Sequence, residues 1–336
     1  MIIKEEDGMR YLLNKSTNPY FNLAFDEYAL KHIDLDEDFF YLWRNEPSVI
    51  VGKNQNTFEE MNHAFIERNH IKVARRVSGG GAVYHDLGNL NFSFIINIED
   101  PGEVNHNKFI FPVIDALKEM GVTVTSSVRN DLMIDGLKIS GNAQRMANRK
   151  LMYHGTLLFD ANLEDMEHAL HVTSNKYTSN GVKSVRSRVT NIKGYLPEST
   201  NIFDFWSSLH FFLSNQGQDK EIVLSENEIA RIEFEAMNKF ATWDWIYGKS
   251  PEFNIVSKKH FKGKDLELKV DVKQGHIQSI RFVIDTLGFK EVNEVEERLK
   301  NIRFHRLDVD STLSRIDLNE CFGEITKDEI LILMFD

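Results

Sequence analysis

The chain has 336 residues, of which 42% are hydrophobic and 11% aromatic, so it holds enough apolar material for packed cores and is not a disordered protein. At roughly 150 residues per domain, this length predicts about two domains. The 40 basic and 51 acidic residues give a net charge of −11, which argues against a protein that wraps nucleic acid. A single cysteine excludes an intramolecular disulfide and a cysteine-based metal site.

Nothing in the chain predicts export or membrane insertion. Residues 1–7 are mostly charged and lack the apolar run of a signal peptide. The longest apolar runs, such as residues 330–335, have the length of a core strand and are far too short to span a bilayer. We therefore expect a cytoplasmic protein without nucleic-acid or membrane partners.

The first 125 residues mix strand and helix patterns. Asn18 can cap a helix that Pro19 opens and that apolar residues extend to Ile33, and Gly121 closes a second, amphipathic helix. The predicted elements are strands over residues 10–13, 39–43, 48–51, 73–77, 92–98 and 122–125, and helices over residues 18–33, 58–68 and 108–120. Because strands and helices do not alternate regularly, the pattern predicts an α+β fold with a large mixed or antiparallel sheet rather than a doubly wound one.

The character of the sequence changes after Thr242. Apolar and polar residues alternate over residues 266–273, which predicts a half-buried strand. Gln274, Gly275 and His276 form a turn, and residues 280–284 form the second strand of the hairpin. We therefore predict a catalytic-sized domain over residues 1–247 and a small α+β domain over residues 254–336.

A glycine-rich segment is the first candidate site. Gly79, Gly80 and Gly81 let the backbone approach a ligand closely and turn its N–H groups toward an anion. Arg76, just before them, has the forked guanidinium that binds a phosphate or a carboxylate. The segment is neither a Walker A loop, since no Gly-Lys-Ser/Thr follows, nor a Rossmann fingerprint, since a strand follows. The alternatives are an anion cradle and a flexible connection between two strands.

A hairpin is the second candidate site. The Asp135-Gly136 turn pairs Ile134 with Leu137 and Met133 with Lys138. Alternation then places apolar side chains on the core face and Asp131, Met133, Lys138 and Ser140 on the other. The alternatives are a solvated outer face and a cation site beside an anion-neutralising lysine.

Two further features carry weaker signals. Residues 173–193 contain five basic residues and no acidic one. The segment is either a solvated loop or a flap over a polyanionic ligand. His154 is a single histidine in a predicted strand, where a structural role is more common than a catalytic one. The basic residues are Lys176, Lys183, Arg186, Arg188 and Lys193.

Three motifs in a fixed order resemble the lipoate–protein ligase family, of the lipoate–protein ligase A type with a C-terminal accessory domain. They are Arg-Val-Ser-Gly-Gly-Gly-Ala-Val-Tyr-His-Asp-Leu-Gly-Asn at residues 76–89, Asn130-Asp131, and Lys-Ile-Ser-Gly-Asn-Ala-Gln at residues 138–144. The resemblance extends over nearly the whole chain. It implies a large α+β catalytic domain of the type shared with biotin ligases, followed by a small C-terminal domain.

The resemblance also implies a reaction in two steps. Lipoate and ATP, with Mg²⁺, give lipoyl-adenylate and pyrophosphate, and the lipoyl group then passes to a lysine of an acceptor protein. The implied acceptors are domains of 2-oxoacid dehydrogenase complexes and the glycine-cleavage H protein. Joining a carboxylate to a phosphate brings two anions together, so the site must supply positive charge and fixed donors.

Roles follow for individual residues from the same resemblance. Lys138 would contact both the lipoyl carboxylate and the α-phosphate as the catalytic residue, and Asp131 would hold Mg²⁺. The nucleotide would be bound by Arg76, Ser78, Gly79, Gly80, Gly81, Ala82, Val83, Tyr84, Asn89, Asn130, Lys138 and Lys183. Lipoate would be bound by Lys138, His85, His154, Gly155 and Trp43, with Phe25 and Val83 as further candidates for its apolar slot. The chain departs from the family pattern at Asp26, where a glutamate is expected, and at Asn142, where serine is also common.

Several rival functions remain at this point. Related lipoyl and octanoyl transferases use a cysteine thiol and no ATP, but Cys321 lies outside the predicted catalytic domain. A biotin ligase would carry a Gly-Arg-Gly-Arg-type loop, which the chain lacks. A non-catalytic lipoate-binding or regulatory relative is disfavoured by Arg76, Asp131 and Lys138.

Overall fold

The computed structural model describes residues 9–33, 37–98, 107–127, 131–172, 176–185, 187–284 and 292–335. The chain forms two compact units. Unit 1 comprises Met1–Lys53, Ile71–His168 and Ser184–Thr242, and unit 2 comprises Asn54–His70, Ala169–Lys183 and Trp243–Asp336. The predicted domain limits at residues 247 and 254 stay a prediction. None of the helices in these ranges has the length and apolar character that crossing a membrane requires.

Unit 1 contains twelve of the described strands. They are β1 (Arg10–Leu13), β2 (Phe39–Trp43), β3 (Ser48–Val51), β4 (Lys72–Arg75), β5 (Val83–His85), β6 (Asn89–Asn97), β7 (Thr125–Ser126), β8 (Leu132–Ile134), β9 (Leu137–Lys138), β10 (Asn142–Ala147), β11 (Lys150–Leu158) and β13 (Glu221–Ile222). The helices that accompany them are α1 (Pro19–His32), α3 (Asn107–Glu119), η3 (Ile192–Tyr195), α5 (Ile202–Leu213), α6 (Glu226–Glu235) and the π-helical turn η4 (Ala236–Phe240). Helix α4 (Leu163–Leu170) crosses from unit 1 to unit 2.

The main sheet of unit 1 has six strands in the order β10-β11-β6-β2-β1-β13. Its β1 pairs are parallel, whereas β2, β6, β11 and β10 pair antiparallel, so the predicted α+β fold with a mixed sheet is confirmed. Two three-stranded sheets, β4-β3-β5 and β7-β8-β9, carry the glycine-rich segment and the predicted hairpin.

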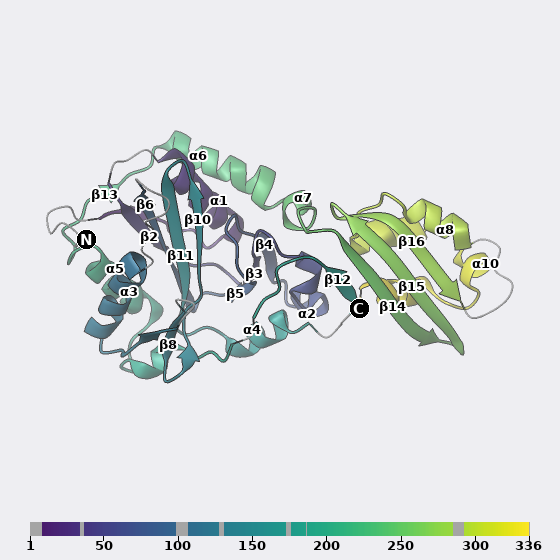
Figure 1. Cartoon of the computed structure of the whole chain (residues 1–336), viewed down its shortest axis with the longest axis horizontal. Coiled ribbons are helices and arrows are strands. Elements are labelled where there is room, and N and C mark those ends of the chain that lie inside the picture. The colour runs from purple at the N-terminus through teal and green to yellow at the C-terminus, as the bar shows by residue number, and fades with distance from the viewer. Residues whose placement is uncertain are drawn as a thin grey trace. The chain divides into compact units, whose positions relative to one another are not determined.

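Helices cover both faces of the main sheet (Figure 1). Because successive side chains of a strand point to opposite faces, Phe40 of β2 joins the core that α3 and α5 cover, while Tyr41 packs edge-on against Phe25 of α1, with ring centroids 5.0 Å apart. Strand β6 shows the same division. Its residues Leu90, Phe92 and Phe94 belong to the α3–α5 core, and its alternate residues Asn89, Asn91 and Ser93 are polar and equally buried.

Several sequence predictions are confirmed residue by residue. Helix α1 is capped by Asn18, whose side chain accepts from the Tyr20 backbone N–H, and Pro19 opens the helix. The hairpin turns at Asp135 and Gly136, both with positive φ, and pairs Met133 with Lys138 as predicted.

Unit 2 is built on the four-stranded sheet β12-β14-β15-β16, with a core of its own. Its strands are β12 (Tyr177–Ser179), β14 (Phe253–Phe261), β15 (Lys264–Lys273) and β16 (His276–Ile284). Its helices are η1 (Thr57–Glu59), α2 (His63–Arg68), α7 (Trp243–Ile246), α8 (Val292–Leu299), α9 (Arg306–Leu313), α10 (Leu318–Phe322) and α11 (Lys327–Phe335). The predicted turn at residues 274–276 joins β15 to β16, with Gln274 and Gly275 at positive φ.

Two element predictions are wrong. The helix expected over residues 58–68 is split into η1 and α2, because Asn56 and Asn62 each cap a new helix start. Of the strand expected over residues 122–125, only Thr125 pairs, with Met133. The apolar run at residues 330–335 forms part of helix α11 (Lys327–Phe335).

Candidate active site

The glycine-rich segment forms a loop between β4 and β5 that is organised around the Arg76 side chain. Its guanidinium, buried from solvent, donates to the carbonyl oxygens of Gly79 (2.6 Å), Gly81 (2.7 Å) and Ile50 (3.0 Å), and its Nε also donates to Ser78 Oγ (3.1 Å). Burial lowers the pKa of Arg76 to about 10, so the side chain stays charged at neutral pH. Most of the donors of Arg76 are therefore engaged by the loop itself.

This arrangement determines where the loop's N–H groups point. In a trans peptide the N–H lies opposite the C=O, so the N–H groups of Gly80 and Ala82 face away from the guanidinium that binds the carbonyls of Gly79 and Gly81. The Ala82 N–H is met there by Ser184 Oγ at 2.8 Å. The Ser184 hydroxyl oxygen thus lies where a phosphate oxygen would lie if the loop binds an anion.

Glycine is required in the loop for a backbone reason. Gly80 has φ +92°, and a Cβ there would lie 2.9 Å from Arg76 Nη2. Gly52, in the neighbouring turn, allows equally close packing, since a Cβ on it would collide with the Gly80 carbonyl oxygen.

Lys138 and Asp131 lie side by side on the outer face of the hairpin, as predicted. Lys138 Nζ is 3.0 Å from Asp131 Oδ1, with 24% and 20% of the two side chains exposed. The Lys138 backbone is held by residues of the predicted flap: its N–H donates to the Arg188 carbonyl oxygen (2.9 Å), and its own carbonyl accepts from Thr190 N–H (3.0 Å). Ser140, also expected on this face, is buried instead.

Lys138 and the glycine loop both lie close to residues 141–143. A Cβ on Gly141 would be 3.3 Å from Lys138 Nζ, and a Cβ on Gly80 would be 4.0 Å from Ala143 Cβ. Residues 141 and 143 are two apart, so in an extended strand they present the same face, with Cα atoms about 7 Å apart. The ammonium group and the loop are therefore within roughly 15 Å of each other, over the start of β10.

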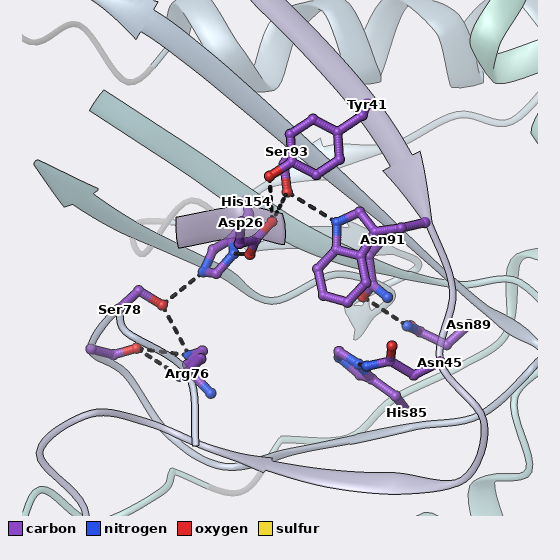
Figure 2. A network of polar contacts seen from close by, with 12 residues as sticks. Asp26, Tyr41, Asn45, Arg76, Ser78, His85, Asn89, Asn91, Ser93 and His154 are labelled. Atoms are coloured by element: carbon purple, nitrogen blue, oxygen red, sulfur yellow. Dashed lines mark hydrogen bonds and ion pairs between the residues drawn. The ribbon is translucent and has the colours of Figure 1, made fainter. Parts of the chain in front are cut away.

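The predicted lipoate residues His154, Gly155, His85 and Trp43 are all buried or enclosed in unit 1. His154 Nδ1 contacts Asp26 Oδ2 at 2.8 Å and its Nε2 contacts Ser78 Oγ at 2.7 Å (Figure 2). Gly155 has a packing role, because a Cβ on it would collide with Asn142 Oδ1 and lie 2.5 Å from the Phe92 ring. Trp43 donates from Nε1 to Ser93 Oγ at 3.0 Å.

His85 is neutral and carries an unpartnered N–H. Burial, with Arg76 and His154 nearby, lowers the pKa of His85 to about 3. Asn22 Nδ2 donates to Asn45 Oδ1, so the Asn45 amide must donate from Nδ2 to His85 Nδ1, 3.0 Å away, which leaves the His85 proton on Nε2. Within the part of the chain that the structure describes, this Nε2 has no partner. A buried donor of this kind calls for a ligand atom or an ordered water.

The remaining predicted residues are placed as follows. Tyr84 is buried, and its pKa is raised by burial and by the charges of Asp86 and Asp165. Asn89 is fully buried and donates from Nδ2 to Asn91 Oδ1 (2.9 Å). Lys183 belongs to unit 2, and Asn130, Arg186 and residues 173–175 of the flap lie outside the described residues. The roles of all the predicted site residues stay predictions.

Sequence reasoning missed Asp26, Tyr41, Ser93 and Ser184. Asp26 is 1% exposed, and its Oδ1 accepts from Tyr41 Oη (2.5 Å) and Ser93 Oγ (3.0 Å). A signal was present, because a polar residue on the apolar face of a predicted helix needs a buried partner.

Cys321→Ser is expected to leave transfer activity within about twofold of the unchanged protein. The thiol is 2% exposed in the core of unit 2, and its Sγ lies 3.4 Å from the Asp317 carbonyl oxygen, an acceptor that a serine hydroxyl could also use. The measurement is acceptor modification by mass, with thermal unfolding as a check on folding. Loss of transfer in a folded variant would support a thioester mechanism.

Two family models and two curated relatives that match this chain belong to one family. Residues 18–211 match the model of the lipoyl protein ligase A/B catalytic domain, and residues 250–334 match the bacterial lipoate protein ligase C-terminus. The chain is 41% identical over 333 residues to lipoate-protein ligase LplJ of Bacillus subtilis, covering 97% of this chain and 100% of that protein. It is 38% identical over 329 residues to lipoate–protein ligase 1 of Staphylococcus aureus, with the same coverage.

Solved structures agree with this result. The chain resembles P. falciparum LipL1 in complex with lipoate, with a TM-score of 0.61 and 26% identity over 92% of this chain and 95% of that one. It also resembles lipoate-protein ligase A bound with ATP, with a TM-score of 0.60 and 26% identity over 72% of this chain and 99% of that one. The chain therefore belongs to the lipoate–protein ligase family and is an enzyme of the ligase class.

Proposed function

We propose that this chain joins lipoate to ATP to form lipoyl-adenylate, and then transfers the lipoyl group to a lysine of an acceptor protein. In the first step a lipoate carboxylate oxygen bonds to the α-phosphorus and pyrophosphate leaves. In the second step the acceptor amine bonds to the acyl carbon and AMP leaves. The observation that carries the proposal is that Lys138 Nζ lies beside Gly141 and the glycine loop lies beside Ala143, two residues further along the chain.

The chemistry of the site suits the first step. Two anions must approach each other, and their repulsion is reduced by a nearby ammonium group and by N–H groups held in fixed directions. Lys138 supplies the ammonium group and the Gly80 N–H supplies a fixed donor, joined by the Ala82 N–H once a phosphate oxygen displaces Ser184 Oγ from it. Relatives crystallised with lipoate and with ATP support these two ligands for the present chain.

Lipoate would lie with its carboxylate near Lys138 and its tail toward Trp43 and His85. Among the described residues the Nε2–H of His85 has no partner, and of the lipoate tail only a dithiolane sulfur, a weak acceptor, could meet it. The side chain of Asn91, which pairs with Trp43 across β2 and β6, has a second buried N–H group without a partner among the described residues.

Magnesium would be held by Asp131. The described residues include no group of three or more His, Cys, Asp or Glu side chains suited to a metal ion. This fits Mg²⁺ in a nucleotide site, which takes one or two carboxylates and completes its shell with phosphate oxygens and waters. Bound there, the ion would neutralise charge on the phosphates, while Asp131 would continue to orient Lys138.

Asp131→Asn is therefore expected to raise the Mg²⁺ concentration that gives half-maximal adenylate formation by about tenfold, because a charged ligand of the ion is lost. The measurement is ATP–pyrophosphate exchange at a series of Mg²⁺ concentrations. If Asp131 only orients Lys138, the variant will lose rate at every Mg²⁺ concentration without a shift of the midpoint.

The proposal is tested by mixing the full chain with lipoate, MgATP and an apo lipoyl domain of a 2-oxoacid dehydrogenase, with apo H protein in a parallel reaction. We expect the acceptor to gain the mass of one lipoyl group. Modification that needs no ATP but requires a lipoyl group already bonded to a donor protein, supplied in place of free lipoate, would indicate a transferase. The absence of both acceptor modification and bound adenylate would indicate a passive binder. The acceptor classes and a cytoplasmic location are part of the proposal.

A further inference from the structure

A chain of hydrogen bonds runs from helix α1 through β11 to the glycine loop (Figure 2). It begins at Asp26 Oδ2, passes through His154 Nδ1 (2.8 Å) and from His154 Nε2 to Ser78 Oγ (2.7 Å), and ends at Arg76 Nε (3.1 Å from Ser78 Oγ). All four side chains are at least nine-tenths buried. This series of hydrogen bonds therefore links helix α1, strand β11 and the glycine loop through buried side chains.

Which group donates and which accepts in each of these hydrogen bonds follows from the two groups at the ends of the series, Asp26 and Arg76. Two hydroxyl groups, those of Tyr41 and Ser93, donate to the Asp26 carboxylate, so Asp26 acts as an acceptor. Burial and the Asp26 charge raise the pKa of Tyr41 well above its usual value, which keeps its hydroxyl a donor. At the other end Arg76 can only donate.

With Asp26 as the acceptor and Arg76 as the donor, one assignment of the hydrogens gives every polar atom between them a hydrogen-bond partner. His154 donates from Nδ1 to Asp26 and accepts at Nε2 from the Ser78 hydroxyl, whose oxygen accepts from Arg76 Nε. The tautomer of His154 is the one that Asp26 selects. A carboxylate and a guanidinium, both buried, are thus coupled through His154 and Ser78.

The same three residue types form the catalytic triad of serine hydrolases, but here the serine is not a nucleophile. In a hydrolase the serine faces the substrate. Ser78 is 1% exposed, and its oxygen already accepts from the positively charged Arg76, which withdraws electron density from it. The chain of hydrogen bonds therefore serves to hold Arg76 rather than to attack an acyl group.

We infer that Asp26 is a positioning residue for the nucleotide: by selecting the His154 tautomer it orients Ser78 and Arg76. It thereby directs toward the phosphates the Gly80 N–H group and the Ala82 N–H group, which Ser184 Oγ meets in the nucleotide-free protein. The path of this effect is short, because Arg76 binds the carbonyls of Gly79 and Gly81, which belong to the same two peptide groups. The inference rests on the proposed role of the loop in nucleotide binding.

The first test uses the unchanged protein, so it does not depend on whether a variant folds. In protein labelled with ¹⁵N-histidine, NMR distinguishes a histidine protonated at Nδ1 from one protonated at Nε2, and His154→Gln identifies the resonance. We expect a neutral His154 with its proton on Nδ1. A proton on Nε2 alone, or on both nitrogens at neutral pH, would overturn the inference.

The second test is a double-mutant cycle on the kinetics of adenylate formation. Asp26→Asn and Ser78→Ala are each expected to raise the KM for ATP about tenfold, with the KM for lipoate within twofold, because each interrupts one buried hydrogen-bond chain. The double variant should be no worse than Ser78→Ala, since residues that act through one chain are not additive. Additive effects, or an equal rise in the KM for lipoate, would contradict the inference.

Tyr41→Phe is the matched control. It also removes a buried hydrogen bond to Asp26, but on Oδ1 and away from His154. We expect its KM for ATP to stay within twofold of the unchanged protein. If Tyr41→Phe matches Asp26→Asn, the effect is general loosening of the network and the inference fails. Ligase activity of the unchanged protein tests the proposed function separately from all of these outcomes.

Discussion

Lys138→Ala is expected to slow adenylate formation about a thousandfold without unfolding the protein. The ammonium group is placed to offset the repulsion between carboxylate and α-phosphate, and losing one such contribution in an enclosed site costs on the order of 10²–10³ in rate. The effect on stability should be below about 1 kcal/mol, because the pair with Asp131 is partly exposed. The measurement is ATP–pyrophosphate exchange together with thermal unfolding.

Lys72→Ala provides the control for this prediction. Lys72 lies in the same unit and its Nζ pairs with Glu46 Oε1 at 2.7 Å, with 36% and 38% of the two side chains exposed, but it belongs to none of the proposed sites. We expect it to retain exchange activity. Lys138→Arg should recover little of the lost rate, since a planar fork cannot replace a compact point charge at this position. Near-normal exchange by Lys138→Ala would refute the catalytic role.

The local structure around the site follows from the sequence to a large extent. The Asp135-Gly136 turn determines the register that puts Lys138 opposite Met133, because the period of a strand is two and a slip by one residue would move every side chain to the other face. Of the three glycines, Gly80 is required by its positive φ and by its close approach to Arg76, whereas a Cβ on Gly81 would meet Ser184 and a Cβ on Gly79 would lie in open space.

What could not be predicted is long-range. The polar network joins Asp26 to His154, 128 positions away, and nothing local to either residue identifies its partner. The alternation of Asn89, Asn91 and Ser93 with apolar residues in β6 is typical of a strand with a solvated face, but all three are buried, and Ser93 donates to Asp26 of α1. Tertiary packing also decides where Ser184 and Arg188 lie, which no periodicity in residues 173–193 indicates.

Arg76→Lys is expected to destabilise the nucleotide-free protein by about 3 kcal/mol and to raise the KM for ATP by more than tenfold. The guanidinium satisfies the carbonyls of Ile50, Gly79 and Gly81 together with Ser78 Oγ, and a single ammonium group cannot reach this set of acceptors. Each buried acceptor that loses its donor costs roughly 1 kcal/mol or more. The loop would then lose its shape before any nucleotide binds.

The two roles for Arg76 make different predictions for the nucleotide-free protein. If Arg76 contacts the phosphate directly, as the family resemblance implies, Arg76→Lys should unfold at the same urea concentration as the unchanged protein without ATP, and differ only when ATP is present. If Arg76 supports the loop, the urea midpoint falls in both conditions. Arg145→Lys is the matched control, because Arg145 Nη1 donates to one loop carbonyl, that of Val77 at 2.6 Å, from a more exposed position. It should cost about 1 kcal/mol and leave the KM for ATP nearly unchanged, since the peptide groups that carry the Gly80 and Ala82 donors stay in place.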